Sequence, residues 1–282
     1  MSAISSQEPR AALARHGLTP KRSFGQNFLA SSDLAERIAT LATTPTGGTV
    51  VEIGCGLGAL TSHLLVRASR VIGIERDRDL VRALTTEFQP DAELGRFQLL
   101  EADAKAIDFA ALLRDAPGPR VLCGNLPYQI TGILLEAAAR SATALDRAVF
   151  MVQLEVAQRL VARPGTAAYG ALSVFLQAQF EVRRPLVVKR GAFYPRPNVD
   201  SAVVEFTPLT SPVPETPVFR KVVKAAFAMR RKKLFNAWTL GLGIPPATLV
   251  PAAARCGIDL NARGETLSAP EFFAFAQELG ET

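Results

Sequence analysis

Residues 49–59 read TVVEIGCGLGA, an apolar run of strand length that passes directly into a glycine-rich loop. Glycine lacks a Cβ, so Gly54, Gly56 and Gly58 allow the backbone to turn tightly and to approach a ligand closely. A helical pattern follows at once, and the free amide groups at the start of a helix favour an anionic group. A strand, a glycine loop and a helix in this order predict a ligand-binding turn at the edge of a parallel sheet.

Four more apolar runs of strand length follow the first, with helical patterns between them. The predicted strands are Thr49–Ile53, Arg70–Glu75, Phe97–Ala102, Arg120–Gly124 and Arg147–Gln153. The predicted helices are Leu57–Arg67, Asp77–Phe88 and Ile130–Arg140. This alternation indicates an α/β fold with helices on both faces of a parallel sheet, whose strands end at one common edge where ligands bind.

The second half of the chain has a different pattern. Glu181–Val188 and Ser201–Thr207 have the composition of strands, and we expect them to form an antiparallel pair at the edge of the sheet. A cluster of prolines then interrupts the chain, after which Thr216 can cap a helix that runs to about Leu240. We therefore predict a large domain over residues 1–211 and a small helical domain over 212–282.

The composition excludes several other classes of protein. Hydrophobic residues make up 48% of the chain and charged residues 21%, as in a globular protein. Two histidines and three scattered cysteines offer no ligand cluster, so we expect no metal site and no disulfide framework. Residues 234–254 carry no charge but contain three prolines, and no apolar leader is visible, so we expect a cytoplasmic protein without a membrane span. The net charge of +6 permits a polyanionic partner.

Two acidic residues follow the second and third predicted strands. Glu75 lies 21 residues after Gly54, at the position from which a carboxylate can accept both hydroxyls of an adenosine ribose. Asp103 comes just after the third strand and can accept a hydrogen bond from an adenine amino group. These residues predict a cofactor that contains adenosine, and they leave NAD and S-adenosylmethionine both open.

The sequence Asn125-Leu126-Pro127-Tyr128 follows the fourth strand at the same edge. The exocyclic amine of a purine is a poor nucleophile because its lone pair is delocalised into the ring. The Asn125 side-chain oxygen and the Leu126 carbonyl can accept its hydrogens, which shifts electron density onto the nitrogen. Pro127 fixes the backbone and Tyr128 offers a ring on which the base can stack. Phe193 can either close the other face of the base or hold the proline loop down as a core residue.

Six motifs together carry a close resemblance over nearly the whole chain. They are Arg22–Leu29, Glu52–Thr61, Ile74–Asp77, Asn125–Tyr128, Phe193–Val204 and the basic run Arg230–Lys233. These motifs are similar to those of the KsgA family of ribosomal RNA adenine dimethyltransferases. The resemblance implies a Rossmann-like, S-adenosylmethionine-dependent methyltransferase fold, with a mostly parallel sheet, an antiparallel edge and a small all-α C-terminal domain that binds RNA.

The resemblance also implies an activity and a partner. The family adds two N6 methyl groups to each of two adjacent adenosines in the 3′-terminal hairpin loop of 16S rRNA, coupled to small-subunit biogenesis. The implied cofactor is S-adenosyl-L-methionine and the implied partner is the small ribosomal subunit. Nothing in the sequence indicates an assembly surface, so we expect a monomer.

Specific residues follow from the resemblance. The implied cofactor site consists of Gln26, Asn27, Leu29, Glu52, Gly54, Gly56, Glu75, Asp103 and Asn125. The implied catalytic residues, which form the target-base pocket, are Asn125, Leu126, Pro127, Tyr128 and Phe193. The residues expected to bind RNA phosphates are Arg22, Arg220, Lys221, Lys224, Arg230, Arg231, Lys232 and Lys233.

Two alternative hypotheses remain. One is an Erm-type large-subunit rRNA adenine methyltransferase, which shares the core motifs. The other is a non-catalytic ribosome-assembly or transcription factor with the same fold. The Val199–Ala202 edge and the basic C-terminal domain favour the small-subunit enzyme over the first, and the intact Asn125–Tyr128 sequence argues against the second.

Overall fold

The structure is a computed structural model, and it describes residues 8–229 and 231–280. The chain forms two compact units. The first extends to Ala157 and includes Val182–Pro208, and the second combines Gln158–Glu181 with the chain from Leu209 onward. The chain passes from the first unit to the second after Pro208, close to the domain boundary expected at 211/212. The segment Gln158–Glu181, however, belongs with the helical unit, whereas we expected it in the α/β domain.

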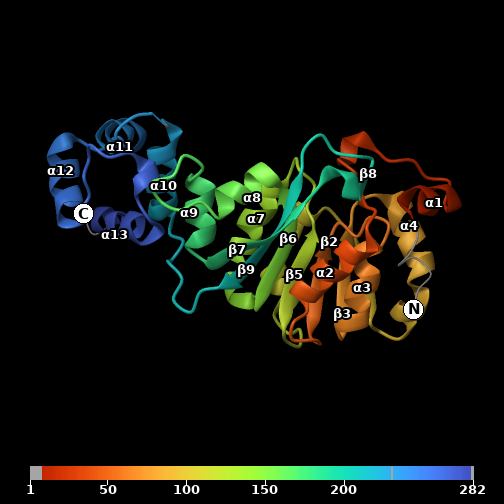
Figure 1. The fold of residues 1–282 in the computed structure, drawn as a ribbon. Helices are drawn as coiled ribbons and strands as arrows, with labels where there is room; N and C mark the ends of the chain where they lie inside the picture. Colours follow the sequence, from red (N-terminus) through yellow and green to blue (C-terminus); the bar gives the residue numbers. More distant parts are fainter. Residues whose placement is uncertain (1–7, 230, 281–282) are drawn as a thin grey trace. The chain divides into compact units, whose positions relative to one another are not determined.

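The first unit is built on a sheet with the strand order β4-β3-β2-β5-β6-β9-β7 (Figure 1). The strands are β2 (Thr49–Ile53), β3 (Arg70–Glu75), β4 (Phe97–Glu101), β5 (Arg120–Asn125), β6 (Arg147–Gln153), β7 (Phe180–Val188) and β9 (Ser201–Pro208). Strands β4, β3, β2, β5 and β6 are parallel, whereas β9 runs antiparallel to β6. The bounds of the five predicted parallel strands are thus confirmed to within one residue. The position of β7 and β9 at one edge of the sheet is also confirmed.

Helices precede, connect and follow the parallel strands. They are α1 (Pro9–Arg15), α2 (Ser32–Ala42), α3 (Ala59–Arg67), α4 (Arg78–Glu87), α5 (Gln89–Glu93), α6 (Phe109–Leu113), α7 (Thr131–Arg140) and α8 (Leu154–Leu160). Helices α2 and α3 pack on each other and share one core cluster with the strands. Helix α4 begins one residue later than predicted because Asp77 is its N-cap, where its side chain accepts a hydrogen bond from Asp79 N.

A small antiparallel pair lies beside the main sheet. Strand β1 (Phe28–Leu29) pairs with β8 (Phe193–Tyr194), and Leu29 lies opposite Phe193. The pair joins the N-terminal segment to the proline loop, and Figure 1 shows β8 beside the part of the chain that carries α1. The N-terminal segment that contains β1 and the proline loop that contains β8 are therefore held together by this pairing.

The second unit is helical. Its helices are α9 (Ala171–Gln177), α10 (Pro217–Ala228), α11 (Leu234–Leu242), α12 (Pro246–Arg255) and α13 (Ala269–Gly280). The Trp238 ring is buried at the centre, stacked 4.1 Å from the Phe275 ring, and its Nε1 donates to Val222 O over 3.0 Å. The Phe175 ring of α9 lies 6.0 Å from the Phe219 ring of α10. This contact explains why the segment before β7 belongs to this unit.

The helix predicted from Thr216 to Leu240 is wrong in its extent. Thr216 caps α10 as expected, accepting from Phe219 N over 3.1 Å, but α10 ends at Ala228 and α11 begins at Leu234. The first amide groups of α11 turn to a different part of the chain, because Leu234 N donates to Ala262 O over 2.8 Å and Phe235 N donates to Leu260 O over 3.0 Å. A loop distant in sequence thus ends the helix.

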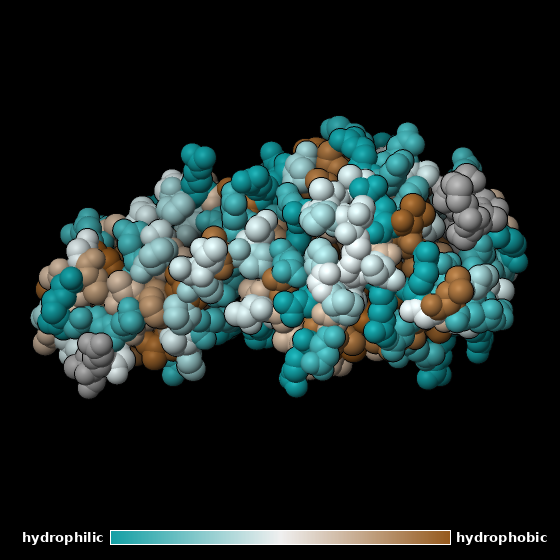
Figure 2. Space-filling model, turned by 90° about the horizontal axis from the view of Figure 1, so that it is seen from below, coloured by the Kyte–Doolittle hydropathy of each residue, from teal (hydrophilic) through white to brown (hydrophobic). Residues whose placement is uncertain are grey.

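No helix within the described part of the chain has the length and apolar character that crossing a bilayer requires. Hydrophilic residues cover much of the face in Figure 2, and hydrophobic ones are scattered among them. Charged and polar side chains therefore dominate that view of the surface.

Candidate active site

One pocket collects the residues at the carboxyl ends of β2, β3 and β5 together with the segment before β1. All of the predicted cofactor residues line it, and so do four of the five predicted catalytic residues: Gln26, Asn27, Leu29, Glu52, Gly54, Gly56, Glu75, Asp103, Asn125, Leu126, Pro127 and Tyr128. The common edge expected from the parallel strands thus brings these positions into one cavity.

The glycine loop forms the floor of this pocket between β2 and α3. Gly54, Gly56 and Gly58 have φ values of +76°, +58° and +81°, a region in which residues with a Cβ are strained. Gly54 N donates to Ile74 O over 2.8 Å, and Gly58 N donates to Cys55 O over 2.9 Å. The turn occupies 54–58, so α3 starts at Ala59, two residues later than predicted.

Glu75 lies at the end of β3 with 8% of its surface exposed. Its carboxylate accepts hydrogen bonds from Gly56 N at 3.0 Å and from Arg76 N and Asp77 N at 2.9 Å each. Burial raises the pKa of Glu75 above its ordinary value, although these three N–H donors act in the opposite direction. A carboxylate has about four acceptor sites, so one remains for a ribose hydroxyl. If Glu75 binds both ribose hydroxyls, the hydrogen bond from Gly56 N–H to its carboxylate must be given up.

Asp103 lies at the pocket rim after β4. Its Oδ1 accepts from Lys105 N over 3.1 Å, and its Oδ2 lies 3.4 Å from the Arg76 guanidinium. The same Arg76 side chain lies 5.5 Å from the centre of the Phe24 ring. Sequence reasoning missed Arg76 and Phe24 as pocket residues; the only available signals were their positions next to Glu75 and within the Arg22–Leu29 motif.

Asn125 ends β5 and lines the pocket, directly after a glycine whose backbone lies against β2. Gly124 has a φ of +157°, and a Cβ at this position would lie 2.3 Å from Ile53 O of β2. Asn125 Nδ2 donates to Asn27 O over 3.0 Å, so the side-chain oxygen of Asn125 is the atom left to accept a hydrogen bond. The orientation that the predicted chemistry requires is therefore set by a residue 98 positions earlier.

The rest of the tetrapeptide forms a rigid turn. Leu126 is 1% exposed and its N–H donates to Met151 O over 3.1 Å. Pro127 O accepts from Ile130 N over 3.1 Å and from Thr131 Oγ1 over 3.0 Å. The Tyr128 hydroxyl lies 2.9 Å from Ser201 Oγ, and burial raises the pKa of this tyrosine. Ser201 thus fixes the ring, a role that the sequence did not indicate.

Phe193 does not line the pocket. Its side chain is 4% exposed and belongs to the core cluster beneath β1 and β8. Of the two roles that the sequence left open, the structure shows the core phenylalanine, because pairing with Leu29 in the small sheet directs this position inward. Stacking of Phe193 on the target base stays a prediction, which this packing does not support.

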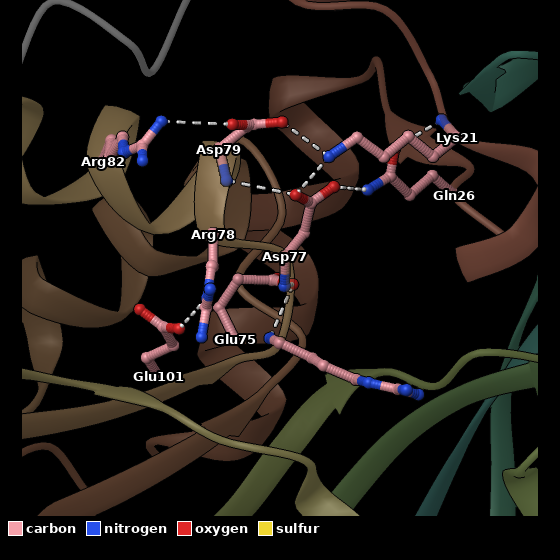
Figure 3. Close-up of polar contacts among 9 residues, drawn as sticks. Lys21, Gln26, Glu75, Asp77, Arg78, Asp79, Arg82 and Glu101 are labelled. Carbon is pink, nitrogen blue, oxygen red and sulfur yellow. Dashed lines mark hydrogen bonds and ion pairs between the residues drawn. The ribbon is translucent and has the colours of Figure 1, made fainter.

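Two other predicted cofactor residues are engaged within the protein. Gln26 Nε2 donates to Asp77 Oδ2 over 2.7 Å, and Gln26 Oε1 accepts from Lys21 N over 2.7 Å (Figure 3). Glu52 is 1% exposed and accepts from Thr61 Oγ1 over 2.6 Å. Burial raises the pKa of Glu52 to about 7. Both residues lie at the pocket wall, where they support neighbouring groups.

Most of the predicted RNA-binding side chains are exposed to solvent, and one of them forms an ion pair within the protein. Lys221, Lys224, Arg231, Lys232 and Lys233 are exposed on α10 and in the turn before α11. Arg220 differs, because its guanidinium pairs with Glu215 and lies 4.8 Å from the centre of the Phe175 ring. Arg230 and the Arg22 side chain lie outside the described part of the structure.

The sheet order, the glycine loop after β2, the carboxylate after β3 and the Asn-Leu-Pro-Tyr turn after β5 define a Rossmann-like methyltransferase. The model of the family described as "Ribosomal RNA adenine dimethylase" matches residues 17–279, and the chain belongs to this family.

Known proteins agree with this assignment. "Ribosomal RNA small subunit methyltransferase A" of Anaeromyxobacter dehalogenans is 43% identical, over 96% of this chain and 98% of the relative. The protein of the same name from Geobacter metallireducens is 40% identical, over 93% of this chain and 96% of the relative. A dimethyladenosine transferase from Plasmodium falciparum has the same fold, with a TM-score of 0.75 at 23% identity, covering 90% of this chain and 98% of its own. The 23S rRNA methyltransferase ErmE also shares the fold, with a TM-score of 0.66 at 23% identity, over 90% of this chain and all of its own.

Proposed function

We propose that this protein dimethylates the N6 amino groups of two adjacent adenosines in the 3′-terminal hairpin loop of 16S rRNA, using S-adenosylmethionine, as a cytoplasmic monomer during small-subunit biogenesis. The observation that carries the proposal is the Asn125 side chain, whose amide group is held by Asn27 O so that its oxygen faces the pocket as an acceptor. The family membership and the full-length relatives named for the small subunit support the choice of substrate.

The donor set of the pocket fits an adenosine cofactor. Glu75 retains an acceptor site for a ribose hydroxyl, and the carboxylate of Asp103 at the pocket rim can accept a hydrogen bond from an adenine amino group. Bound S-adenosylmethionine supplies a methyl group on a positively charged sulfur. The Glu75 carboxylate, which accepts three backbone N–H groups, and the Asp103 carboxylate at the rim supply acceptor oxygens that suit such a ligand.

Asn125 and Leu126 act on the target amine. Leu126 is fixed by its N–H bond to Met151, and its carbonyl receives none of the hydrogen bonds that the described residues make. This carbonyl and the Asn125 oxygen can each accept one N6 hydrogen, which directs the nitrogen lone pair toward the methyl donor. A strong base is unnecessary because the proton can leave after the methyl group is transferred, and the rate depends mainly on positioning.

The exposed basic residues of the helical unit would hold the RNA. Lys221, Lys224, Arg231 and Lys232 supply positive charge that can contact phosphates without reading sequence. Adenines in a hairpin loop are already partly unstacked, so turning one into the pocket costs less than in a duplex. Arg220, which pairs with Glu215, has a weaker claim to a phosphate contact than these exposed residues.

The two alternative functions are not favoured. The full-length relatives at 40–43% identity are named for the small subunit, whereas ErmE shares the fold at 23% identity. The intact pocket around Asn125 and Glu75 argues against a protein that has lost catalysis.

Methyl transfer from labelled S-adenosylmethionine to small ribosomal subunits that lack the modification tests the function. We expect label in two neighbouring adenosines, with dimethyladenosine as the final product after nuclease digestion and mass spectrometry. Large subunits from the same cells serve as the matched control. Label in the large subunit, label in a single adenosine, or no label would each refute the proposal.

A further inference from the structure

Lys21 lies outside the set of residues that the motifs and the pocket assign to the chemistry, yet it makes two short ion pairs beside the pocket. Its Nζ is 2.6 Å from Asp77 Oδ1 and 2.6 Å from Asp79 Oδ2 (Figure 3). The Asp77 side chain is only 3% exposed, whereas those of Lys21 and Asp79 are 36% and 39% exposed. An ammonium group shared by two carboxylates, one of them buried, forms strong charge-assisted hydrogen bonds.

The same Asp77 carboxylate binds the N-terminal segment a second time. Its other oxygen accepts from Gln26 Nε2 over 2.7 Å, and Gln26 Oε1 in turn accepts from the backbone N–H of Lys21 over 2.7 Å. Figure 3 shows Lys21 and Gln26 approaching Asp77 from the same segment. Residues 21–26 are therefore closed into a loop whose two ends meet on one aspartate.

Both segments that meet at Asp77 also contain a residue of the proposed site: Glu75 in one and Asn27 in the other. On one side, the backbone N–H of Asp77 donates to Glu75 Oε1 over 2.9 Å and orients the carboxylate that faces the cofactor ribose. On the other side, Asn27 follows Gln26 directly, and Asn27 O accepts from Asn125 Nδ2 over 3.0 Å. Asp77 thus links the carboxylate for the cofactor to the amide for the target base through short, defined bonds.

We propose that Lys21 is a positioning residue of the methyl-donor site: by bridging Asp77 and Asp79 it holds the segment that carries Asn27 against the loop that carries Glu75. The proposal rests on the proposed function for the identity of the cofactor. Lys21 touches neither reactant. It acts through Asp77 and Gln26, and its removal leaves a buried carboxylate with one fewer donor and the segment before β1 with one fewer attachment.

The electrostatics agree with this geometry. Burial acts to raise the pKa of Asp77, but the hydrogen bonds from Lys21 and Gln26 outweigh burial and hold that pKa below the ordinary value. The hydrogen bonds from Lys21 to Asp77 and Asp79 raise the pKa of the Lys21 ammonium group. Both shifts favour the charged forms of Lys21 and Asp77 near neutral pH.

The test compares Lys21→Met with Lys21→Arg and with the matched control Arg15→Met. Arg15 lies in the same N-terminal segment and pairs with Glu87 at the other end of α4 over 3.5 Å, so its replacement removes the same charge away from the pocket. Calorimetric titration should show S-adenosylmethionine binding about tenfold more weakly to Lys21→Met, the value of one ordinary charge-assisted hydrogen bond. Lys21→Arg should retain most of the affinity, and Arg15→Met should match the wild type.

Steady-state methylation gives a second measure. For Lys21→Met we expect the KM for S-adenosylmethionine to rise about as much as the dissociation constant and kcat to fall because Asn27 is less well held, while the KM for the small subunit stays within twofold. The melting temperature should fall further for Lys21→Met than for Arg15→Met, because the buried Asp77 carboxylate loses a donor, and both variants should remain folded at the temperature of the assay. Unchanged cofactor affinity in Lys21→Met, or an equal loss in Arg15→Met, would overturn the proposal.

Hydrogen exchange of the ligand-free protein separates this inference from the proposed function. Amides of residues 21–29 should exchange faster in Lys21→Met than in the wild type or Arg15→Met. Faster exchange together with no methylation by the wild type would refute the function and leave the positioning contact standing. Unchanged exchange would refute the contact whatever the enzyme modifies.

Discussion

At the residue scale, the proposed chemistry depends on the orientation of one side-chain amide, that of Asn125. Asn125 can polarise an adenine amine only if its oxygen, and not its nitrogen, faces the substrate. The bond from Asn125 Nδ2 to Asn27 O fixes that choice. Asn125 can thus accept a hydrogen bond from the target while its amide nitrogen donates to Asn27 O. Alanine has neither group, and an aspartate carboxylate has no donor.

Replacing Asn125 by alanine should lower kcat for methyl transfer by at least about a hundredfold, the usual effect of removing one preorganised polar group from a transition state. Binding of the small subunit should change little because phosphate contacts lie elsewhere. Filter binding and labelled methyl transfer measure the two quantities, with Asn236→Ala on the exposed side of α11 as the control. Near-normal methylation by Asn125→Ala would contradict the assigned role.

Glu52 gives a second prediction at this scale, in the pH dependence of stability. Its pKa is raised from 4.5 to about 7 in the folded protein, so between these values the folded state binds more protons than the unfolded state and stability falls as the pH rises. At about 1.4 kcal/mol per pKa unit, the loss amounts to about 3 kcal/mol. Glu52→Gln should therefore unfold like the wild type near pH 4.5 and be about 3 kcal/mol more stable above pH 7.

Urea unfolding at a series of pH values measures this difference. The exposed residue Glu36, replaced by glutamine in the same way, should give a difference that does not vary with pH. A pH-independent difference for Glu52→Gln would mean that its carboxyl group titrates normally in the folded protein.

At the scale of elements, the approach of β5 to β2 places Asn125. Gly124 permits this approach, because any Cβ there would meet Ile53 O at 2.3 Å. The glycine immediately before the Asn-Leu-Pro-Tyr sequence is visible in the sequence, but nothing in the local pattern distinguishes a close strand contact from an ordinary turn glycine.

Gly124→Ala should destabilise the protein by about 3 kcal/mol, because the added methyl group forces the two strands apart and the φ of +157° strains any residue with a Cβ. Gly132 is the matched control. It lies in α7 with no atom within 4 Å of an added Cβ, so Gly132→Ala should leave stability unchanged or raise it by about 0.5 kcal/mol. Thermal unfolding followed by circular dichroism compares the two, and equal melting temperatures would contradict the close approach.

The turn between α10 and α11 is the second element with a functional consequence. A continuous helix would have spread the basic residues around its circumference, whereas the break gathers Arg231, Lys232 and Lys233 in one exposed turn. Lys233 also donates to Asn261 Oδ1 over 3.0 Å, which attaches the turn to the loop before α13.

Replacing Arg231 and Lys232 by glutamine should weaken RNA binding and reduce the slope of log affinity against log salt by about 2, one unit for each phosphate contact that is lost. Arg255→Gln removes a charge that pairs with Glu278 and should leave the slope unchanged. Titrations of a small-subunit RNA fragment at several salt concentrations provide the measurement. An unaltered slope in the double variant would exclude the turn from the RNA interface.

At the scale of the whole molecule, the pocket and the exposed basic residues lie in different compact units. The unit with the mixed sheet contains the complete pocket, and the helical unit contains the exposed basic residues of α10 and the turn. We therefore expect ligand binding to the pocket to be a property of the sheet unit, and RNA affinity to depend in addition on the helices.

S-adenosylmethionine at one hundred times its dissociation constant should stabilise the folded protein by about 2.7 kcal/mol, since it binds the folded state alone. That corresponds to an increase in melting temperature of several degrees. S-adenosylhomocysteine should act similarly, whereas NAD at the same concentration should have no effect if the family's cofactor is the one that binds. A shift with NAD and none with S-adenosylmethionine would reverse the choice of cofactor.

The strands, the glycine loop and the pocket-lining positions followed from the amino-acid sequence because hydrophobic periodicity, turn residues and strand ends are local properties. The parallel sheet then brought Glu75, Asp103 and Asn125 to one edge as expected. Contacts between distant segments were not local and could not be inferred. They buried Phe193 against Leu29, paired Arg220 with Glu215 and bound the start of α11 to the 260–262 loop. The same kind of contact turned the Asn125 amide toward Asn27, since a side chain adopts the orientation that its neighbours in space allow.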